Sequence, residues 1–282
     1  MLEEANNFIK KMEATMNKDN EINTNSEMKV GVDLGTSHIV ITVLDKENNP
    51  VCGEMYRASA VRDGIVVDYL NAVHIVSKLK DKIEKRLGRE LEYAATAIPP
   101  GISEGNIKVM KNVVEGAGFE VNNVVDEPTA AAYTLGITDG AIVDIGGGTT
   151  GISILKNGNV IYTADEPTGG THLSLVLAGY YGISFEEAEE LKRKNEKHRE
   201  ILPIVTPVLE RVGNIVTRYI KGYDVDIIYL VGGTCCLEGC EKVIEKYTGI
   251  KCVKPENPLL VTPMGIAINS QLQGGVSYEG NF

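Results

Sequence analysis

Two aspartates in this chain each stand inside an apolar run and shortly before a glycine-rich turn. Asp33 precedes the turn at 35–37, which reads Gly-Thr-Ser, and Asp144 precedes the turn at 146–150, which reads Gly-Gly-Gly-Thr-Thr. Such turns expose backbone N–H groups, and glycine lets the backbone approach phosphate oxygens closely. Carboxylates repel phosphates unless a divalent cation lies between them, and Mg²⁺ is the hard cation that fits. The two segments therefore predict a site for a magnesium-bound phosphate compound.

The two turns belong to an internal repeat. A shift of 111 positions lays VDLGTSHIVITVLDKEN over VDIGGGTTGISILKNGN, which pairs Asp33 with Asp144 and Gly35 with Gly146. A repeated Val-Asp-apolar-Gly core in two predicted hairpins indicates a duplicated α/β unit, with the related turns facing each other across a cleft. The alternative is a pair of tight hairpins whose aspartates only cap turns, and the duplication makes that alternative weaker.

The glycine run does not fit the two best-known phosphate-binding loops. Residues 146–151 satisfy G-x-G-x-x-G, but the dinucleotide fingerprint requires a helix to follow at once. Here the continuation ISILKNGNVIY is β-branched and alternating, which predicts a strand. The pattern G-x-x-x-x-G-K-[ST] does not occur in the sequence. A Rossmann site and a P-loop are therefore both excluded.

Glu127 opens the segment EPTAAAY, where Pro128 suits the first turn of a helix. A carboxylate is favoured at a helix N-terminus, so helix capping alone accounts for Glu127. A second interpretation places this carboxylate at the mouth of the cleft, where it orients or deprotonates a water in line with a terminal phosphate. Both interpretations stay open.

Two long stretches carry the elements that must position these residues. Residues 28–140 and 141–257 each predict strands and amphipathic helices, and we expect them to form two lobes. A small-faced helix at about 258–272 is expected to return to the first lobe. Small residues at Ala130–Ala132 and at Gly265 let two helices approach closely, which predicts a hinge at the base of the cleft.

Residues 1–27 differ in composition from the rest of the chain. Their apolar residues fall at helical spacing, and a polar linker follows. One interpretation is a terminus that packs loosely on its own domain. The other is a docking peptide that binds a partner groove through Leu2, Ile9 and Met12.

Composition excludes several classes of protein. The net charge of −11 opposes binding to nucleic acid, and the sequence lacks an apolar run near the ~20 residues that a membrane span requires. Five cysteines without a C-x-x-C pair, in a chain without a secretory signal, indicate a reducing cytoplasm. The strongly charged helix predicted within 184–200 is interpreted as a solvated face.

Four motifs in order resemble the actin and heat-shock-chaperone ATPase superfamily. They are Asp33-Leu-Gly-Thr-Ser, Asp126-Glu-Pro-Thr-Ala-Ala-Ala, Asp144-Ile-Gly-Gly-Gly-Thr-Thr and Val231-Gly-Gly-Thr. They are similar to the first phosphate, connecting, second phosphate and adenosine motifs of that family, and their combination is far more specific than any one of them. The resemblance implies an α/β, two-lobed actin-like ATPase with a duplicated ribonuclease-H-like fold.

Carried over residue by residue, the resemblance implies roles for individual positions. Asp33 and Asp144 would hold the Mg²⁺ ion. The residues implied in catalysis are Asp33, Glu127, Asp144 and Thr149. The residues implied in contact with ATP are Gly35, Thr36, Ser37, Gly146, Gly147, Gly148, Thr149, Thr150, Gly170, Glu210, Gly232 and Gly233.

The chain also departs from the family pattern. The spans from Asp33 to Pro99 and from Gly170 to Gly232 are too short for the large outer subdomains of the heat-shock chaperones, which predicts a minimal version of the fold. We identify no lysine in the sequence that is placed to reach the γ-phosphate as the chaperone's lysine does. This departure predicts slow hydrolysis, or hydrolysis that needs a partner.

The chain length and the segment VRDGIVVDY at 61–69 are similar to a chaperone-like branch of this superfamily. That branch belongs to ethanolamine utilization and is linked to bacterial microcompartments. The resemblance implies ATP and Mg²⁺ as ligands, and an ethanolamine-degrading enzyme or a microcompartment shell protein as partner. The alternatives are a filament-forming actin relative, a small-molecule kinase of the same superfamily, and a nucleotide-dependent scaffold without hydrolysis.

Overall fold

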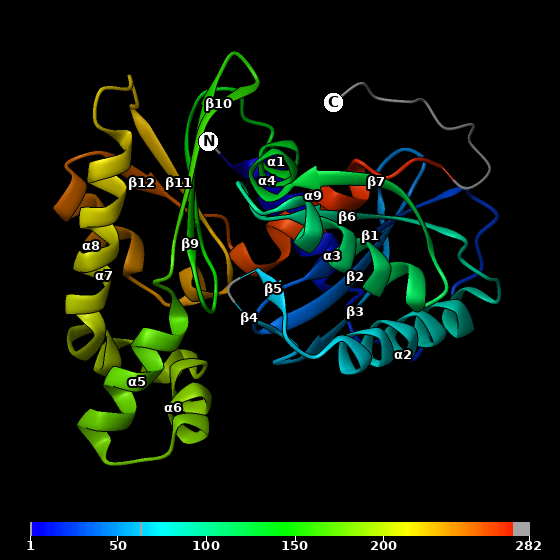
Figure 1. The fold of residues 1–282 in the computed structure, drawn as a ribbon, viewed down its shortest axis with the longest axis horizontal. Coiled ribbons are helices and arrows are strands. Elements are labelled where there is room, and N and C mark those ends of the chain that lie inside the picture. Colours follow the sequence, from blue (N-terminus) through cyan, green and yellow to red (C-terminus); the bar gives the residue numbers. More distant parts are fainter. Residues whose placement is uncertain (1, 63, 273–282) are drawn as a thin grey trace.

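Two five-stranded sheets organise the computed structural model, which describes residues 2–62 and 64–272 (Figure 1). We call the sheet with order β3-β2-β1-β6-β7, with its helices, the first lobe. The sheet with order β10-β9-β8-β11-β12 and its helices form the second lobe. The strands of the first sheet are β1 (Met28–Leu34), β2 (His38–Asp45), β3 (Pro50–Arg57), β6 (Tyr93–Ile98) and β7 (Glu120–Asp126). Those of the second are β8 (Gly140–Ile145), β9 (Thr150–Lys156), β10 (Asn159–Glu166), β11 (Ile227–Val231) and β12 (Lys251–Val253).

The two sheets have the same topology. In each, three strands consecutive in the chain pair antiparallel, and two later strands add in parallel on the other side of the first of them. Parallel additions need crossover connections, which helices supply in both lobes. The predicted duplicated α/β fold is therefore confirmed, and the repeat at 111 positions corresponds to the hairpins β1–β2 and β8–β9.

Helices cover the outer faces of both sheets and fill the space between them. The helix α2 (Tyr69–Leu87) packs with the first sheet, and α7 (His198–Ile220) and α8 (Cys240–Thr248) pack with the second (Figure 1). The first lobe also contains the small hairpin of β4 (Val61–Arg62) and β5 (Ile65–Val66). The remaining helices are α1 (Glu3–Glu13), α3 (Glu104–Gly116), α4 (Glu127–Leu135), α5 (Gly170–Tyr181), α6 (Phe185–Lys192) and α9 (Val261–Ile268). Short 3₁₀ turns are η1 (Asn195–Lys197), η2 (Gly233–Cys236) and η3 (Pro258–Leu260).

Helices α4 and α9 cross between the lobes at very short range. A Cβ atom added to Gly265 would lie 1.8 Å from the carbonyl oxygen of Ala130, so only glycine permits this approach. On its other side α9 lies against β1, where a Cβ on Gly31 would lie 2.4 Å from the backbone nitrogen of Ala267. The close crossing that the small residues predict is thus present.

The N-terminal helix α1 does not offer its apolar face to a partner. Ile9 and Met12 are fully buried and Leu2 is 8% exposed, in a cluster that includes residues of both lobes. The expectation that these three side chains dock on a partner groove is wrong for this conformation, because the chain's own groove already buries them. No helix in the described part of the chain combines the length and apolar character that a bilayer crossing requires.

Candidate functional site

A cavity of about 350 Å³ lies between the lobes, where the turns that follow β1 and β8 meet. A Cβ atom on Gly147 would lie 2.2 Å from Ser37 Oγ, so the two turns touch at a point where glycine leaves room. The predicted residues that line the cavity are Asp33, Gly35, Thr36, Ser37, Glu127, Asp144, Gly147, Gly232 and Gly233. The structure therefore brings both aspartates, both turns and Glu127 to one place.

Three carboxylates share this cavity, and their pKa values are raised. Burial raises the pKa of Asp33 to about 7, and the negative charge of Asp144 adds to the rise. Burial also raises the pKa of Asp144 to about 6, although a hydrogen bond from Thr262 Oγ1 (3.2 Å) opposes that shift. Burial, followed by the charges of Asp144 and Asp33, raises the pKa of Glu127 well above its usual range. By itself, the cavity therefore disfavours the ionised forms of all three carboxylates.

Glu127 owes its position to the helix α4, which it opens directly after β7. The capping of this helix falls to the preceding residue, because the backbone N–H of Thr129 donates to Asp126 Oδ1 at 2.9 Å. Glu127 is left to face the cavity beside Asp33 and Asp144. Of the two interpretations of Glu127, the cavity position is the one that its side chain adopts.

The turn at 146–149 is held by the second lobe. The carbonyl of Gly146 accepts from the backbone N–H of Gly170 (2.9 Å) and from Thr234 Oγ1 (2.8 Å), and the carbonyl of Gly147 accepts from the N–H of Thr171 (2.8 Å). Gly170 thus supports the turn through its backbone. A Cβ there would lie 2.5 Å from Thr234 Oγ1, so the position has no room for a side chain.

Other residues of this turn point elsewhere. Thr150 is fully buried, and its hydroxyl donates to the carbonyl of Thr168 at 2.5 Å. Gly148 lines a neighbouring pocket with Thr36 and Arg193, while Gly146 and Thr149 belong to the turn without lining the main cavity. Of this turn, it is Gly147 that reaches the cavity wall.

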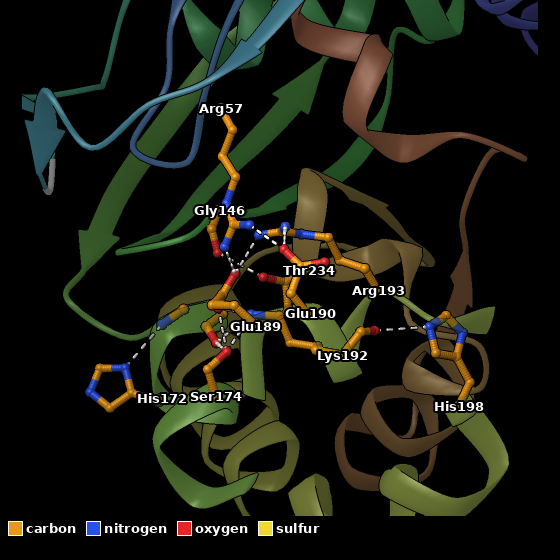
Figure 2. A network of polar contacts seen from close by, with 12 residues as sticks. Arg57, Gly146, His172, Ser174, Glu189, Glu190, Lys192, Arg193, His198 and Thr234 are labelled. Atoms are coloured by element: carbon orange, nitrogen blue, oxygen red, sulfur yellow. Dashed lines mark hydrogen bonds and ion pairs between the residues drawn. The ribbon is translucent and has the colours of Figure 1, made fainter. Parts of the chain in front are cut away.

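Charged residues of α6 and of the position after it form one wall of the cavity. We interpreted the charged helix within 184–200 as a solvated face, but Glu189 is 8% exposed, and Glu189, Lys192 and Arg193 line the cavity. Lys192 Nζ donates to Glu189 Oε1 (2.5 Å), to Ser174 Oγ (2.7 Å) and to the carbonyl of Gly170 (2.9 Å) (Figure 2). The spacing of these three charges at i, i+3 and i+4 places them on one helix face, and that was the signal available in the sequence.

Burial and neighbouring charges together shift the pKa values of Lys192 and Glu189. Burial lowers the pKa of Lys192, and the neighbouring Glu189 opposes that shift. Burial raises the pKa of Glu189, but Lys192, Ser174 and Arg193 outweigh it and hold the net value below its usual range. Lys192 Nζ uses its three N–H donors on Glu189, Ser174 and Gly170, so this wall offers a bound ligand the acceptor oxygens of Glu189.

The first lobe reaches this wall through Arg57 at the end of β3. One nitrogen of its guanidinium lies 2.5 Å from Glu190 Oε1, and another lies 3.8 Å from Glu189 Oε2 (Figure 2). Arg57 and Arg193 also lower the pKa of the nearby His38, after burial as the main cause, to about 4. His38 is therefore neutral at physiological pH and adds no charge to the cavity.

The glycine loop after β11 forms the remaining wall. Gly232 has a φ of +88°, and a Cβ there would lie 2.2 Å from Asp144 Oδ1, so glycine is required. Glu210, in contrast, lies in a separate pocket between α7 and α8 with Arg199 and Tyr247. The structure does not bring Glu210 to the cavity, because it lies three turns into α7, away from the end nearest Lys192.

The cavity's donor set suits magnesium. Carboxylate oxygens from two opposed strands and several hydroxyls are hard ligands, and Mg²⁺ commonly binds through one or two carboxylates while keeping several waters. Within residues 2–62 and 64–272, no three His, Cys, Asp or Glu side chains form a complete metal cage. Asp33 and Asp144 would therefore hold the ion together with water and a phosphate ligand.

Comparisons with known proteins agree with this architecture. The profile of the MreB/Mbl protein family matches residues 51–194, and that of the type IV pilus assembly protein PilM matches residues 138–263. The ethanolamine utilization protein EutJ of Escherichia coli is 44% identical over 255 residues, 90% of each chain. The crystal structure of EutJ from Carboxydothermus hydrogenoformans superposes with a TM-score of 0.89 at 49% identity, covering 94% of this chain and 98% of that one.

A more distant structure has the same fold. MreB5 of Spiroplasma citri, crystallised with AMPPNP, superposes with a TM-score of 0.70 at 16% identity, over 87% of this chain and 96% of that one. At this identity the likeness establishes the actin-like fold alone. With the identity to the two EutJ proteins over nearly the whole chain, it leads to one conclusion: this chain belongs to the EutJ family of ethanolamine utilization proteins, and its fold is that of the actin-like ATPases.

Proposed function

We propose that this protein binds ATP with Mg²⁺ in the cavity between its lobes and that the nucleotide sets how far the lobes close. The observation that carries the proposal is the contact of two repeated glycine turns, Gly147 against Ser37, beside Asp33 and Asp144. A ligand shifts a conformational equilibrium only by its differential affinity for the two states. A triphosphate held by both turns has that property, since it gains its full set of contacts only in the closed state.

The walls of the cavity suggest how the nucleotide lies. The backbone N–H groups of 35–37 and of Gly147 would contact the phosphates. The loop at Gly232 and Gly233 would lie under the nucleoside. On the opposite wall Glu189, held in place by Lys192, offers an acceptor to ribose hydroxyls. In this proposal Glu189 replaces Glu210 as the acidic contact to the nucleoside.

The carboxylates would carry the reaction. Bound Mg²⁺ would neutralise charge on the phosphates, which is the main need of phosphoryl transfer. Asp33 and Asp144 would hold the ion from the two lobes. Glu127, whose pKa is raised by burial and by its acidic neighbours, is basic enough to accept a proton from a water it orients. We propose weak ATP hydrolysis without a direct role for Thr149, which does not line the cavity.

The proposed cellular role follows from the family. The EutJ relatives are named for ethanolamine utilization, and we propose a chaperone-like or assembly role toward an ethanolamine-degrading enzyme or a microcompartment shell protein. The MreB fold makes nucleotide-dependent filaments the second candidate. Sedimentation with ATP and Mg²⁺ separates the two, because filaments pellet and an assembly factor that acts as a monomer does not.

Calorimetry on one sample tests the binding proposal. We expect ATP to bind in the presence of Mg²⁺ and to lose at least tenfold in affinity when EDTA removes the ion, or in Asp33→Ala and Asp144→Ala. Phosphate release followed on the same sample measures hydrolysis. Glu210→Ala is the matched control, because Glu210 lies in another pocket and should leave binding unchanged. Equal ATP affinity in all four proteins would overturn the proposal.

A further inference from the structure

The N-terminal helix α1 lies at the junction of the lobes and has contacts with both. Its buried side chains belong to a cluster that contains Val40 of β2 in the first sheet and Val231 of β11 in the second. In Figure 1, α1 lies between the two halves of the molecule, near α4 and α9. A helix that only completed the first lobe would not need to bury residues against the second.

Hydrogen bonds anchor the end of α1 and the following residues to the first lobe. The backbone N–H of Met55 donates to Asn17 Oδ1 at 2.8 Å, and that of Asn17 donates to the carbonyl of Gly53 at 3.0 Å. The buried Arg86 donates to the carbonyl of Thr15 at 3.0 Å. These bonds attach the residues that follow α1 to β3 and α2, both of which belong to the first lobe.

Two further bonds attach α1 to the segment that follows β12 in the second lobe. The backbone N–H of Glu256 donates to Asn6 Oδ1 at 3.0 Å, and Asn257 Nδ2 donates to Glu13 Oε1 at 2.9 Å. Asn6 and Glu13 lie seven residues apart, two turns along one side of the helix. The second lobe is thus held along most of the length of α1.

The segment that bonds to α1 continues into η3, which forms part of the cavity wall. Asn257 precedes η3, where the carbonyl of Pro258 accepts from the backbone N–H of Gly232 at 3.1 Å. Leu259 lines the cavity and would lie 3.2 Å from a Cβ on Gly233. On the first-lobe side, Val40 belongs to the same cluster as α1 and also lines the cavity. One layer of side chains therefore separates α1 from the site.

We propose that α1 joins the two lobes by binding in the groove between them, and that it docks more tightly when the lobes are closed on the nucleotide. This inference adds a regulatory element to the proposed function. Because linkage is reciprocal, nucleotide binding tightens the docking of α1, and release of α1 speeds the loss of nucleotide. A protein that captures the apolar face of released α1 will therefore bind the nucleotide-free chain more tightly.

Surface substitutions in the full chain test the proposal without disturbing the core. Asn6→Ala with Glu13→Ala removes both bonds to the second lobe and leaves the attachment to the first lobe intact. The matched control is Lys10→Ala with Lys11→Ala, two residues on the exposed face of the same helix. Both proteins keep Ile9 and Met12, so both should fold.

Hydrogen exchange without nucleotide measures directly whether α1 supports the second lobe. The amide of Leu260 bonds to Asn257, that of Cys235 to Gly232 and that of Leu237 to Thr234. We expect these amides to exchange about three- to tenfold faster in the Asn6/Glu13 variant, and at the unmodified rate in the lysine control. Faster exchange confined to α1 itself would overturn the proposal, because it would mean that α1 does not support the second lobe.

The dwell time of a fluorescent ATP analogue with Mg²⁺ provides the second measurement. We expect release about three- to tenfold faster in the Asn6/Glu13 variant than in the control. Unchanged release from a protein that binds the analogue would overturn the coupling. If the analogue does not bind to the unmodified chain, the proposed function fails, whereas the exchange measurement still decides whether α1 joins the lobes.

Discussion

The two glycine turns have related sequences but differ in how the protein supports them. The turn at 146–149 is fastened from outside its own hairpin, by Gly170, Thr171 and Thr234. The turn at 35–37 has a bond within its own sheet, from the N–H of Ala58 to the carbonyl of Ser37 at 3.1 Å. The second turn is thus built into the helices that form the cavity, while the first approaches from the other lobe.

This difference indicates a division of labour between duplicated parts. A preorganised turn binds a ligand without paying the cost of ordering it. We therefore expect the second lobe to supply most of the affinity for a phosphate ligand, and the first lobe to respond by closing. The asymmetry arose in residues outside the repeat, since Gly170 and Thr234 lie beyond the aligned segments.

The largest expected effect comes from disturbing the second turn through Gly232. In Gly232→Ala the new Cβ would lie 2.2 Å from Asp144 Oδ1 and 2.6 Å from the carbonyl of Ile145, at a φ of +88°. Backbone strain and the clash together should lower the free energy of unfolding by about 2–4 kcal/mol. We expect ATP affinity to fall more than a hundredfold, since the loop and Asp144 move together.

Gly249→Ala is the matched control for this substitution. Gly249 also has a positive φ, +71°, but a Cβ there meets nothing within 4 Å. The control should lose only about 1 kcal/mol of stability and keep its ATP affinity. Urea unfolding and calorimetry measure both quantities. Equal losses in the two variants would mean that the contact with Asp144 is unimportant.

A second expected effect distinguishes the two aspartates by pH. The pKa of Asp33 is raised by burial and by Asp144 to about 7, so its folded-state value exceeds its unfolded value. The protonated carboxyl therefore favours the folded state below about pH 4, and this contribution is lost as the pH rises through about 7. Without nucleotide, we expect the free energy of unfolding to fall by up to about 4 kcal/mol between pH 4 and 8, because a shift of about 3 pKa units corresponds to about 1.4 kcal/mol per unit.

Substitution by asparagine locates the source of this pH dependence. Asp33→Asn should flatten the profile and stabilise the nucleotide-free protein at pH 8. Asp144→Asn should flatten it less, because the pKa of Asp144 is raised only to about 6 by burial, against the bond from Thr262. Urea unfolding at several pH values measures both. A profile that stays equally steep in Asp33→Asn would remove Asp33 as its cause.

The sequence predicted the backbone of the site better than its side chains. The turns, the repeat and the close helix crossing were predictable because glycine and alanine mark places where backbones approach. Glu189 and Lys192 were missed because a charged helix face looks alike in solvent and in a cavity wall. The hydrogen bonds from Lys192 to Gly170 and Ser174 decide that this face lines the cavity. Such contacts between distant segments leave no local pattern in the sequence.

The position of α1 was not predictable for a related reason. Its amphipathic spacing indicates an apolar face that must be buried, but spacing is silent on whether a partner or the same chain buries it. The bonds that decide the matter join Asn6 and Glu13 to residues about 250 positions away in the chain. Periodicity predicts an element, whereas docking depends on the completed fold.

The smallest expected effect tests the asymmetry of the turns most directly. Thr234→Val keeps the shape of the side chain but removes the hydroxyl that donates to the carbonyl of Gly146 at 2.8 Å. Gly146 retains its bond from Gly170, so the second turn should loosen without collapsing and become more like the first. Loss of one such bond costs about 1 kcal/mol, so we expect ATP affinity to fall about fivefold.

Thr248→Val is the control for this last substitution, since its hydroxyl donates to the carbonyl of Ile244 within α8, at 2.9 Å and away from the cavity. Calorimetry should give an unchanged ATP affinity for the control, and hydrogen exchange should be faster at the Gly170 and Thr171 amides only in Thr234→Val. If the second turn is preorganised because outside residues hold it, weakening one of those bonds must raise the cost of ordering the turn when ligand binds. An unchanged affinity in Thr234→Val would mean that the glycine turns are equivalent in binding, and that the division of labour between the lobes originates elsewhere.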